Sequence, residues 1–255
     1  MEIRLDGKVA LVTGASTGIG AAIAIAFAKA GARLVIHYNN SAAEAKKVAA
    51  EVSSCGGGDP LLVKADVLDG QAITDMVRAV NGRFGRIDIL VNNAGGLLGR
   101  YSVEDMSDEG YERVMELNVG STFRVSRSVI PVMKKSGGGA IINMTSVAAR
   151  NGGSDGATLY ATSKAAVSTL TRGMAKELAP HKIRVNAIAP GIILTPFHDK
   201  YTSPEALKKL IASIPLGRGA TAEEVAGPAL FLASEQLSSF ITGEILEVNG
   251  GALIA

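Results

Sequence analysis

Seven short apolar runs alternate with segments of helical periodicity along the whole chain. The apolar runs predict strands at residues 8–13, 32–38, 60–65, 87–92, 139–145, 182–189 and 244–248. The segments between and after them predict helices at residues 18–30, 41–54, 69–83, 107–135, 157–179, 204–213 and 221–234. Such alternation is typical of a parallel sheet covered by helices on both faces. We therefore predict an α/β fold with a doubly wound parallel sheet, in one domain spanning residues 1–255.

Composition excludes several other classes of protein. A chain of 255 residues with 47% hydrophobic and 20% charged residues can bury one large core. Its net charge of +2, without a long run of Lys or Arg, predicts no nucleic-acid partner. No apolar stretch is long enough to cross a bilayer and the first residues show no signal-peptide pattern, so we expect a cytoplasmic protein without membrane contact. A lone cysteine, Cys55, agrees with a reducing compartment. Three scattered histidines predict no metal site.

The first predicted strand leads directly into three glycines, Gly14, Gly18 and Gly20, with the spacing G-x-x-x-G-x-G. A glycine-rich turn can bring bare backbone N–H groups up to a pyrophosphate, and the start of the following helix adds a partial positive charge. The motif therefore predicts a dinucleotide site. Taken alone, it is also compatible with a strand-to-helix turn that binds no ligand.

Tyr160 and Lys164 are four residues apart in the predicted helix 157–179, so their side chains emerge on one face. A free tyrosine has a pKa of about 10, and a nearby ammonium group lowers that pKa by stabilising the phenolate. The pair therefore predicts a tyrosine that exchanges a proton with a substrate. An ordinary surface pair on an amphipathic helix is the alternative.

Several ordered motifs now give the chain a family resemblance. They are T-G-A-S-T-G-I-G at 13–20, A-D-V at 65–67, N-N-A-G at 92–95, N-V-G at 118–120, S-V-A-A at 146–149, Y-A-T-S-K at 160–164 and N-A-I-A-P-G at 186–191. With these motifs in register over essentially its full length, the chain resembles the short-chain dehydrogenase/reductase family. The resemblance implies a Rossmann-type fold and an NAD(P)-dependent oxidoreductase that transfers a hydride between nicotinamide and a carbonyl or hydroxyl group.

The resemblance also implies roles for four catalytic residues. Tyr160 would be the general acid that protonates a carbonyl oxygen, and Ser146 would orient and polarise that carbonyl. Lys164 would hold the nicotinamide ribose, and Asn118 would help to hold a water chain that returns protons to Lys164. Ser146 lies fourteen positions before Tyr160, one more than is usual in the family. We expect the extra residue to enlarge the loop 150–156 over the substrate.

By the same resemblance, four segments would bind the cofactor: the glycine-rich loop, the ends of the third and fourth strands, and the stretch after the sixth strand. Their residues, with the catalytic pair, are Gly14, Ser16, Thr17, Gly18, Ile19, Gly20, Asp66, Val67, Asn93, Ala94, Gly95, Tyr160, Lys164, Pro190, Gly191, Ile193 and Thr195. Asp66 would accept a hydrogen bond from the adenine amine; alternatively it only forms a turn.

The end of the second strand bears on which nicotinamide cofactor is used. An acidic residue there would bind the ribose of NAD and repel the 2′-phosphate of NADP. This chain instead has Tyr38, Asn39, Asn40 and Ser41, which we expect to contact the cofactor, and residues 41–44 form a capping-box pattern. We therefore predict a preference for NADPH. The stretch contains no arginine or lysine and Ser16 is not basic, so the preference is expected to be moderate and NADH remains possible.

Polar and basic segments are expected around Tyr160, with a lid at about 195–215. The predicted substrate contacts are Gly96, Arg100, Ser146, Asn151, Tyr160 and His198. Arginine can bind a carboxylate bidentately and the other side chains can serve hydroxyl groups, so we predict a sugar, a uronate or a sugar-derived keto acid. Arg100, Arg150 and Lys200 are otherwise solvated loop charges. The alternatives are a 3-oxoacyl-[acyl-carrier-protein] reductase and a catalytically silent nucleotide sensor.

Association is expected on grounds of resemblance. The predicted helices 107–135 and 157–179 match those that pair across a two-fold axis in the family. The C-terminal stretch 251–255 is apolar. We therefore expect a homotetramer.

Overall fold

The central sheet contains seven parallel strands in the order β3-β2-β1-β4-β5-β6-β7. The computed structural model describes residues 2–253, and the predicted C-terminal residues Ile254 and Ala255 lie outside this range. The strands are β1 (Val9–Val12), β2 (Arg33–Tyr38), β3 (Leu61–Lys64), β4 (Ile89–Asn92), β5 (Gly139–Met144), β6 (Ile183–Pro190) and β7 (Ile245–Val248). The predicted Rossmann-type sheet is confirmed.

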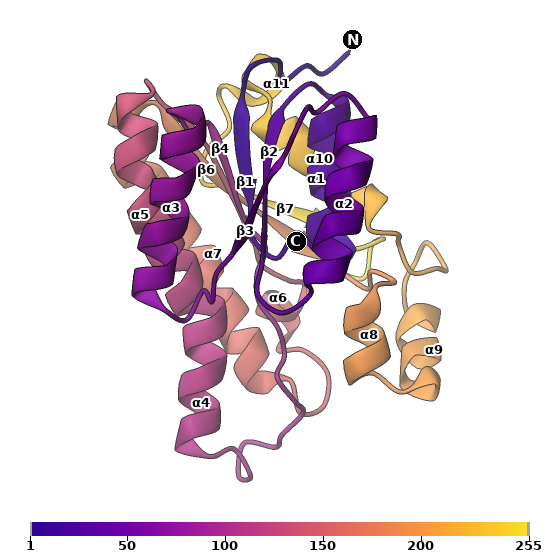
Figure 1. The fold of residues 1–255 in the computed structure, drawn as a ribbon. Helices are drawn as coiled ribbons and strands as arrows, with labels where there is room; N and C mark the ends of the chain where they lie inside the picture. The colour runs from indigo at the N-terminus through magenta and orange to yellow at the C-terminus, as the bar shows by residue number, and fades with distance from the viewer. Residues whose placement is uncertain (1, 254–255) are drawn as a thin grey trace.

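Helices cover both faces of this sheet (Figure 1). One layer consists of α1 (Gly18–Lys29), α2 (Ala42–Ser54) and α10 (Glu223–Ala233), and the other of α3 (Gly70–Phe84), α5 (Ser121–Lys135) and α7 (Thr158–Leu178). Along β1, Ala10 and Val12 join the core on the α1 side, whereas Val9 and Leu11 join the core on the α3 side. Because both faces are buried, this strand reads as an unbroken apolar run.

A wider turn divides the predicted helix 107–135. It consists of α4 (Asp108–Met115), the π-helical segment η1 (Glu116–Gly120) and α5, which follow one another without a gap. The pattern on either side of η1 still has the α-helical period, so the sequence does not reveal the turn. Single π-helical turns are frequent at functional sites, and η1 carries Asn118.

Short helices account for most other differences from the prediction. Periodicity cannot detect α6 (Ala148–Asn151), α8 (Pro196–Tyr201), α11 (Glu235–Ser238) or the 3₁₀ turn η2 (Ala179–His181), which are too short to show a repeat. The predicted loop 150–156 therefore begins inside α6. The segment 195–215, which we expect to form a lid, contains α8 and α9 (Pro204–Ala212).

The predicted capping box is wrong. Ser41 does precede α2, but its side chain makes no capping hydrogen bond. Over residues 2–253, no helix is both long enough and apolar enough to span a bilayer.

Asp88 joins β1 to β4 at the amino ends of the strands. Its side chain is only 5% exposed. Oδ2 accepts hydrogen bonds from the backbone N–H of Val9 (2.9 Å) and from Nε of Arg86 (2.8 Å). A carboxylate is tolerated in such a buried position because its oxygens are paired.

Asp88→Ala should lower the free energy of unfolding by about 1–3 kcal/mol, because it leaves the buried N–H of Val9 without an acceptor. Asp88→Asn is the matched control, since its amide oxygen can still accept that bond, and it should have a smaller effect. Chemical denaturation followed by circular dichroism measures both. Equal losses in the two variants would contradict this assignment.

Candidate active site

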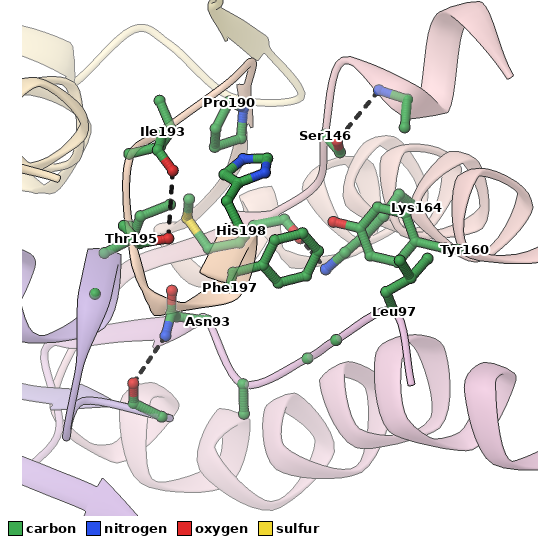
Figure 2. A pocket seen from close by; sticks show the side chains of 18 of the residues that line it. Asn93, Leu97, Ser146, Tyr160, Lys164, Pro190, Ile193, Thr195, Phe197 and His198 are labelled. Carbon is green, nitrogen blue, oxygen red and sulfur yellow. Dashed lines mark hydrogen bonds between the residues drawn. The ribbon is translucent and has the colours of Figure 1, made fainter. Parts of the chain in front are cut away.

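A cavity of about 960 Å³ lies at the carboxyl ends of the strands and gathers segments that are far apart in the sequence (Figure 2). Most residues expected at the cofactor line it. They are Gly14, Ser16, Thr17, Gly18, Ile19, Asn39, Asn40, Ser41, Asp66, Val67, Asn93, Ala94, Gly95, Tyr160, Lys164, Pro190, Gly191, Ile193 and Thr195. Of the residues expected at the substrate, Gly96, Arg100, Ser146, Asn151, Tyr160 and His198 line the same cavity.

Gly20 and Tyr38 were expected at the cofactor but lie outside this lining. A Cβ atom on Gly20 would stand 2.4 Å from the carbonyl oxygen of Gly14, so this glycine permits close packing of α1 against the loop. Tyr38 packs against the hydrophobic core on the α1 side. The neighbouring His37, which the sequence analysis did not assign to the site, lines the cavity instead. The structure therefore places Gly20 and Tyr38 beside the cavity lining and not in it.

The glycine-rich loop presents backbone to the cavity. Gly14 and Gly18 have positive φ angles of 62° and 56°, and a Cβ atom on Gly14 would stand 3.1 Å from the Cα atom of Ala94. The first turn of α1 carries no acidic residue, and the Thr17 side chain does not cap it. The backbone N–H groups of the loop and the positive end of α1 fit the pyrophosphate of a dinucleotide.

Hydrogen bonds fasten this loop to the end of β4. The Thr13 hydroxyl accepts from the backbone N–H groups of Asn93 (2.9 Å) and Ala94 (3.0 Å). In return, Nδ2 of Asn93 donates to the carbonyl oxygens of Thr13 and Gly14, both at 3.0 Å. The strand order reverses between β1 and β4, and open α/β folds bind their ligands beyond the strand ends at such a point.

Asp66 both forms a turn and lines the cavity in which we expect the cofactor to bind. Its Oδ1 accepts a hydrogen bond from the backbone N–H of Leu68 at 2.9 Å, which makes it a turn-forming residue. It also lines the cavity. The turn therefore holds the carboxylate in place at the cavity wall.

Tyr160 and Ser146 come together at the mouth of the cavity. Ser146 ends the segment after β5, where its Oγ accepts a hydrogen bond from the backbone N–H of Ala148 at 3.1 Å. Tyr160 is half-buried and lines the cavity. Burial raises its pKa to about 12, although a hydrogen bond with Ser146 opposes this increase. The tyrosine is therefore protonated at neutral pH.

Lys164 lies one turn further along α7 and is buried. Its Nζ donates to the carbonyl oxygen of Met144 at 2.8 Å and lies 5.8 Å from the centre of the Tyr160 ring. Burial lowers the pKa of Lys164 to about 8. The expectation that Lys164 lowers the pKa of Tyr160 is not met in the free protein, because desolvation dominates at both groups.

Asn118 lies behind the cavity wall and does not line it. Its Oδ1 accepts from the backbone N–H of Gly96 (3.0 Å), and its Nδ2 donates to the carbonyl oxygens of Gly96 (2.9 Å) and Val114 (3.0 Å). A Cβ atom on Gly95 would stand 2.7 Å from Oδ1 of Asn118 and 3.2 Å from Nζ of Lys164. Asn118 and Lys164 therefore both border the space that a side chain at position 95 would occupy.

The stretch after β6 closes the cavity opposite Tyr160. Gly191 has no room for a side chain, because its Cβ atom would stand 2.8 Å from the Cα atom of Asn249. Ile193 pairs with Ala220 in a β-bridge, and the Thr195 hydroxyl donates to the carbonyl oxygen of Ile193 at 3.3 Å. Figure 2 shows Ile193 and Thr195 beside Pro190, at the start of the lid.

Arg100 uses its guanidinium group to join the lid to the loop before Tyr160. Nε donates to the carbonyl oxygen of Tyr201 (2.6 Å). Nη1 donates to the hydroxyl of Ser154 (3.0 Å) and the carbonyl oxygen of Asp155 (2.8 Å). The expected bidentate contact with a substrate carboxylate is therefore corrected, since these donors already have protein acceptors.

Phe197 is a cavity residue that sequence reasoning missed. Its ring centre lies 6.2 Å from that of Tyr160 and 5.4 Å from that of His198. Figure 2 shows the Phe197 ring between these two side chains. His198 is paired through Nδ1 with the Thr202 hydroxyl at 3.1 Å, and burial lowers its pKa. The one available signal was the position of Phe197, directly after Pro196 at the start of the lid.

The cavity is less polar than the sequence suggested. Arg150 forms an ion pair with Glu247 at 3.5 Å, and Lys200 lies over the Tyr201 ring at 5.1 Å. Neither side chain lines the cavity, so the structure favours the alternative in which Arg150 and Lys200 are loop charges without a substrate contact. Apolar side chains that line it include Leu97, Leu98, Val147, Phe197, Leu210 and Ile214.

The chain matches known proteins over nearly its whole length. A family model described as Enoyl-(Acyl carrier protein) reductase matches residues 14–252. A 7alpha-hydroxysteroid dehydrogenase of Escherichia coli is 42% identical over 252 residues, covering 99% of this chain and 96% of that protein. A 3-oxoacyl-[acyl-carrier-protein] reductase of Thermotoga maritima is 41% identical over 253 residues, covering 99% of this chain and 100% of that protein.

The fold is equally similar to solved structures. An NADH-dependent reductase A1-R′ responsible for alginate metabolism superposes with a TM-score of 0.89 at 38% identity, covering 98% of this chain and 99% of the other. Sequence and fold together establish that the chain belongs to the short-chain dehydrogenase/reductase family of NAD(P)-dependent oxidoreductases.

Proposed function

We propose that the protein uses NADPH to reduce the carbonyl group of a sugar, a uronate or a sugar-derived keto acid. The observation that carries the proposal is the convergence of a protonated Tyr160, the Ser146 hydroxyl and a buried Lys164 on one cavity, with His198 and Asn151 bordering the same space. The first three residues suit proton transfer, and the last two suit hydroxyl groups of a substrate.

In this mechanism, the chain supplies a proton and the bound nicotinamide supplies a hydride. Ser146 hydrogen-bonds the carbonyl oxygen and draws electron density towards it. Tyr160, protonated at neutral pH, gives its proton to that oxygen as the carbonyl carbon receives the hydride, and the product is an alcohol.

Lys164 then favours return of a proton to Tyr160. Its lowered pKa of about 8 allows it to give and take protons near neutral pH, and in its cationic form it stabilises a phenolate. Asn118 acts through position, since its side chain fixes the backbone of Gly96 next to Lys164. We propose that Asn118 also helps to hold a chain of water molecules that returns protons to Lys164.

The preference for NADPH rests on the end of β2. Asn39, Asn40 and Ser41 border the cavity there, without an acidic side chain that would repel a 2′-phosphate. Because no basic side chain accompanies them, the preference is modest. The relative from alginate metabolism is itself described as NADH-dependent, so the preference proposed for this chain rests on its own residues and not on that relative.

The substrate class rests on the polar groups beside Tyr160 and on that same relative. Asn151 borders the cavity, and its Oδ1 accepts a hydrogen bond from the backbone N–H of Gly153 at 2.9 Å. Its Nδ2 is therefore the side-chain group that we expect to bind the substrate. His198 retains Nε2 for a ligand, since Nδ1 pairs with Thr202. Both nitrogens suit hydroxyl or carboxylate oxygens.

A second candidate, reduction of a 3-oxoacyl chain, is favoured by the apolar part of the cavity. Leu97, Phe197, Leu210 and Ile214 could cover an acyl chain. The relative from Thermotoga maritima is named for this reaction.

We also propose that copies of the chain associate as a homotetramer. Tyr111 on α4 and Phe123 on α5 are 50% and 47% exposed, and both lie in the stretch 107–135, one of the two that we expect to pair between copies. Burying such aromatic surface would favour association.

A panel of keto sugars, uronates and α-keto acids should contain a substrate whose kcat/KM exceeds that of a short 3-oxoacyl thioester by at least about tenfold, or ~1.4 kcal/mol of transition-state stabilisation. Its kcat/KM should be higher with NADPH than with NADH. His198→Ala should raise KM for this substrate and leave KM for the thioester unchanged. Loss of cofactor absorbance measures each rate. Efficient turnover of the thioester alone would favour the second candidate.

Tyr160→Phe should reduce kcat by about 10²-fold or more, because the variant lacks the proton donor. The ring that packs near Phe197 is retained, so the Kd for NADPH should stay within about twofold of the wild-type value. Calorimetric titration and steady-state kinetics provide the two numbers. Undiminished turnover would overturn the role assigned to Tyr160.

A further inference from the structure

His37 connects the glycine-rich loop to the end of β3. The residue lies in β2, is only 2% exposed and borders the cavity. Its Nδ1 lies 3.0 Å from the backbone nitrogen of Gly14, and its Nε2 lies 3.1 Å from the carbonyl oxygen of Ala65. Its own carbonyl oxygen accepts a hydrogen bond from the backbone N–H of Ala15 at 2.9 Å. One residue thus holds two consecutive N–H groups of the loop.

The two ring partners select a single form of the imidazole. A carbonyl oxygen can only accept, so Nε2 must carry the hydrogen. A backbone N–H can only donate, so Nδ1 must be bare. A protonated His37 would turn a second N–H towards the N–H of Gly14, and the bond that holds the loop would become a repulsive contact.

The surroundings of His37 shift its pKa in opposite directions. Burial lowers its pKa below 6.5, while the hydrogen bond to Ala65 and the negative charge of Asp66 oppose this effect. The packed loop 13–20 contributes no titratable side chain. Next to His37 in β2, Tyr38 packs against the core, and on the neighbouring strand β3, Lys64 is exposed. Asp66 is therefore the charge that acts on the ring.

Gly14 is the residue at which the loop turns. Its positive φ angle starts the turn, and its carbonyl oxygen is already held by Asn93 at 3.0 Å from the β4 side. His37 holds the N–H of the same residue from the β2 side. Losing this bond leaves the loop fastened on one side only.

We propose that His37 is a positioning residue for the dinucleotide, which keeps the glycine-rich loop in its binding geometry only as a neutral imidazole. Protonation of His37 releases Gly14, so the affinity for the cofactor falls in acid. The inference depends on the dinucleotide site and not on the identity of the substrate.

Calorimetric titration of the full-length protein with NAD⁺ between pH 5 and 8 tests this proposal. NAD⁺ is the probe because the 2′-phosphate of NADP itself titrates at about pH 6. For the wild-type protein, Kd should be constant above about pH 7 and should rise up to about tenfold per pH unit once pH falls below the pKa of His37.

Two substitutions at position 37 separate positioning from simple packing. In His37→Asn, Oδ1 takes the place of Nδ1 and can still accept from Gly14, whereas the shorter side chain loses the bond to Ala65 and cannot be protonated. It should bind NAD⁺ within about threefold of wild type at pH 8 and show no increase in Kd in acid. His37→Leu loses both bonds and should bind weakly at every pH.

His198→Asn is the matched control, because His198 also borders the cavity and its pKa is also lowered. This variant should keep the wild-type increase in Kd below pH 6.5. Nitrogen NMR of ¹⁵N-histidine-labelled protein gives a second readout, in which His37 should have a bare Nδ1 and a protonated Nε2 at pH 8.

An acid-induced increase in Kd that persists in His37→Asn would overturn the proposal, and so would the opposite tautomer at pH 8. If His37→Leu fails to fold, His37→Asn still decides the question through its pH profile. Failure of the wild-type protein to bind either NAD⁺ or NADP⁺ at pH 8 would refute the dinucleotide site together with this inference. Failure of the sugar-acid screen alone would leave it intact.

Discussion

The buried ammonium group of Lys164 is the constraint on which the rest of the site depends. Its carbonyl acceptor, Met144, ends β5, and the glycine on its other side, Gly95, follows β4. Tyr160 lies one turn earlier on α7. The hydrogen bond from Nζ to the carbonyl oxygen of Met144 stabilises the cation at this point. Burial acts against the cation and lowers the pKa of Lys164 to about 8. The folded chain releases this proton before the unfolded chain does, so the free energy of unfolding should rise between about pH 8 and 10.5.

The parallel sheet makes this meeting point possible. All seven strands run in one direction, so the loops that follow them open on the same edge. Thr13 and Asn93 fasten the loops after β1 and β4 to each other, and His37 fastens the first of these loops to β3. The proton-transfer residues come from β5 and α7. The two halves of the site therefore belong to one rigid edge of the sheet.

Sequence reasoning recovered what depends on local pattern. The strands were predicted because buried parallel strands are unbroken apolar runs, and the shared face of Tyr160 and Lys164 followed from helical spacing. It failed where the answer depends on tertiary packing. The direction of the Tyr160 pKa shift is set by desolvation, and the acceptors of Arg100 come from Ser154, Asp155 and Tyr201, far along the chain. The role of His37 likewise depends on two partners that only the fold brings near.

Direct titration of Lys164 tests the central claim that burial at the strand ends sets its proton affinity. In protein labelled with ¹³C-lysine, the Cε resonance that disappears in Lys164→Arg can be followed from pH 6 to 11. A midpoint of about 8 is expected in the free protein. A midpoint near the ordinary lysine value of 10.5 would contradict the account, because the ammonium would then be solvated and not held between Met144 and Tyr160.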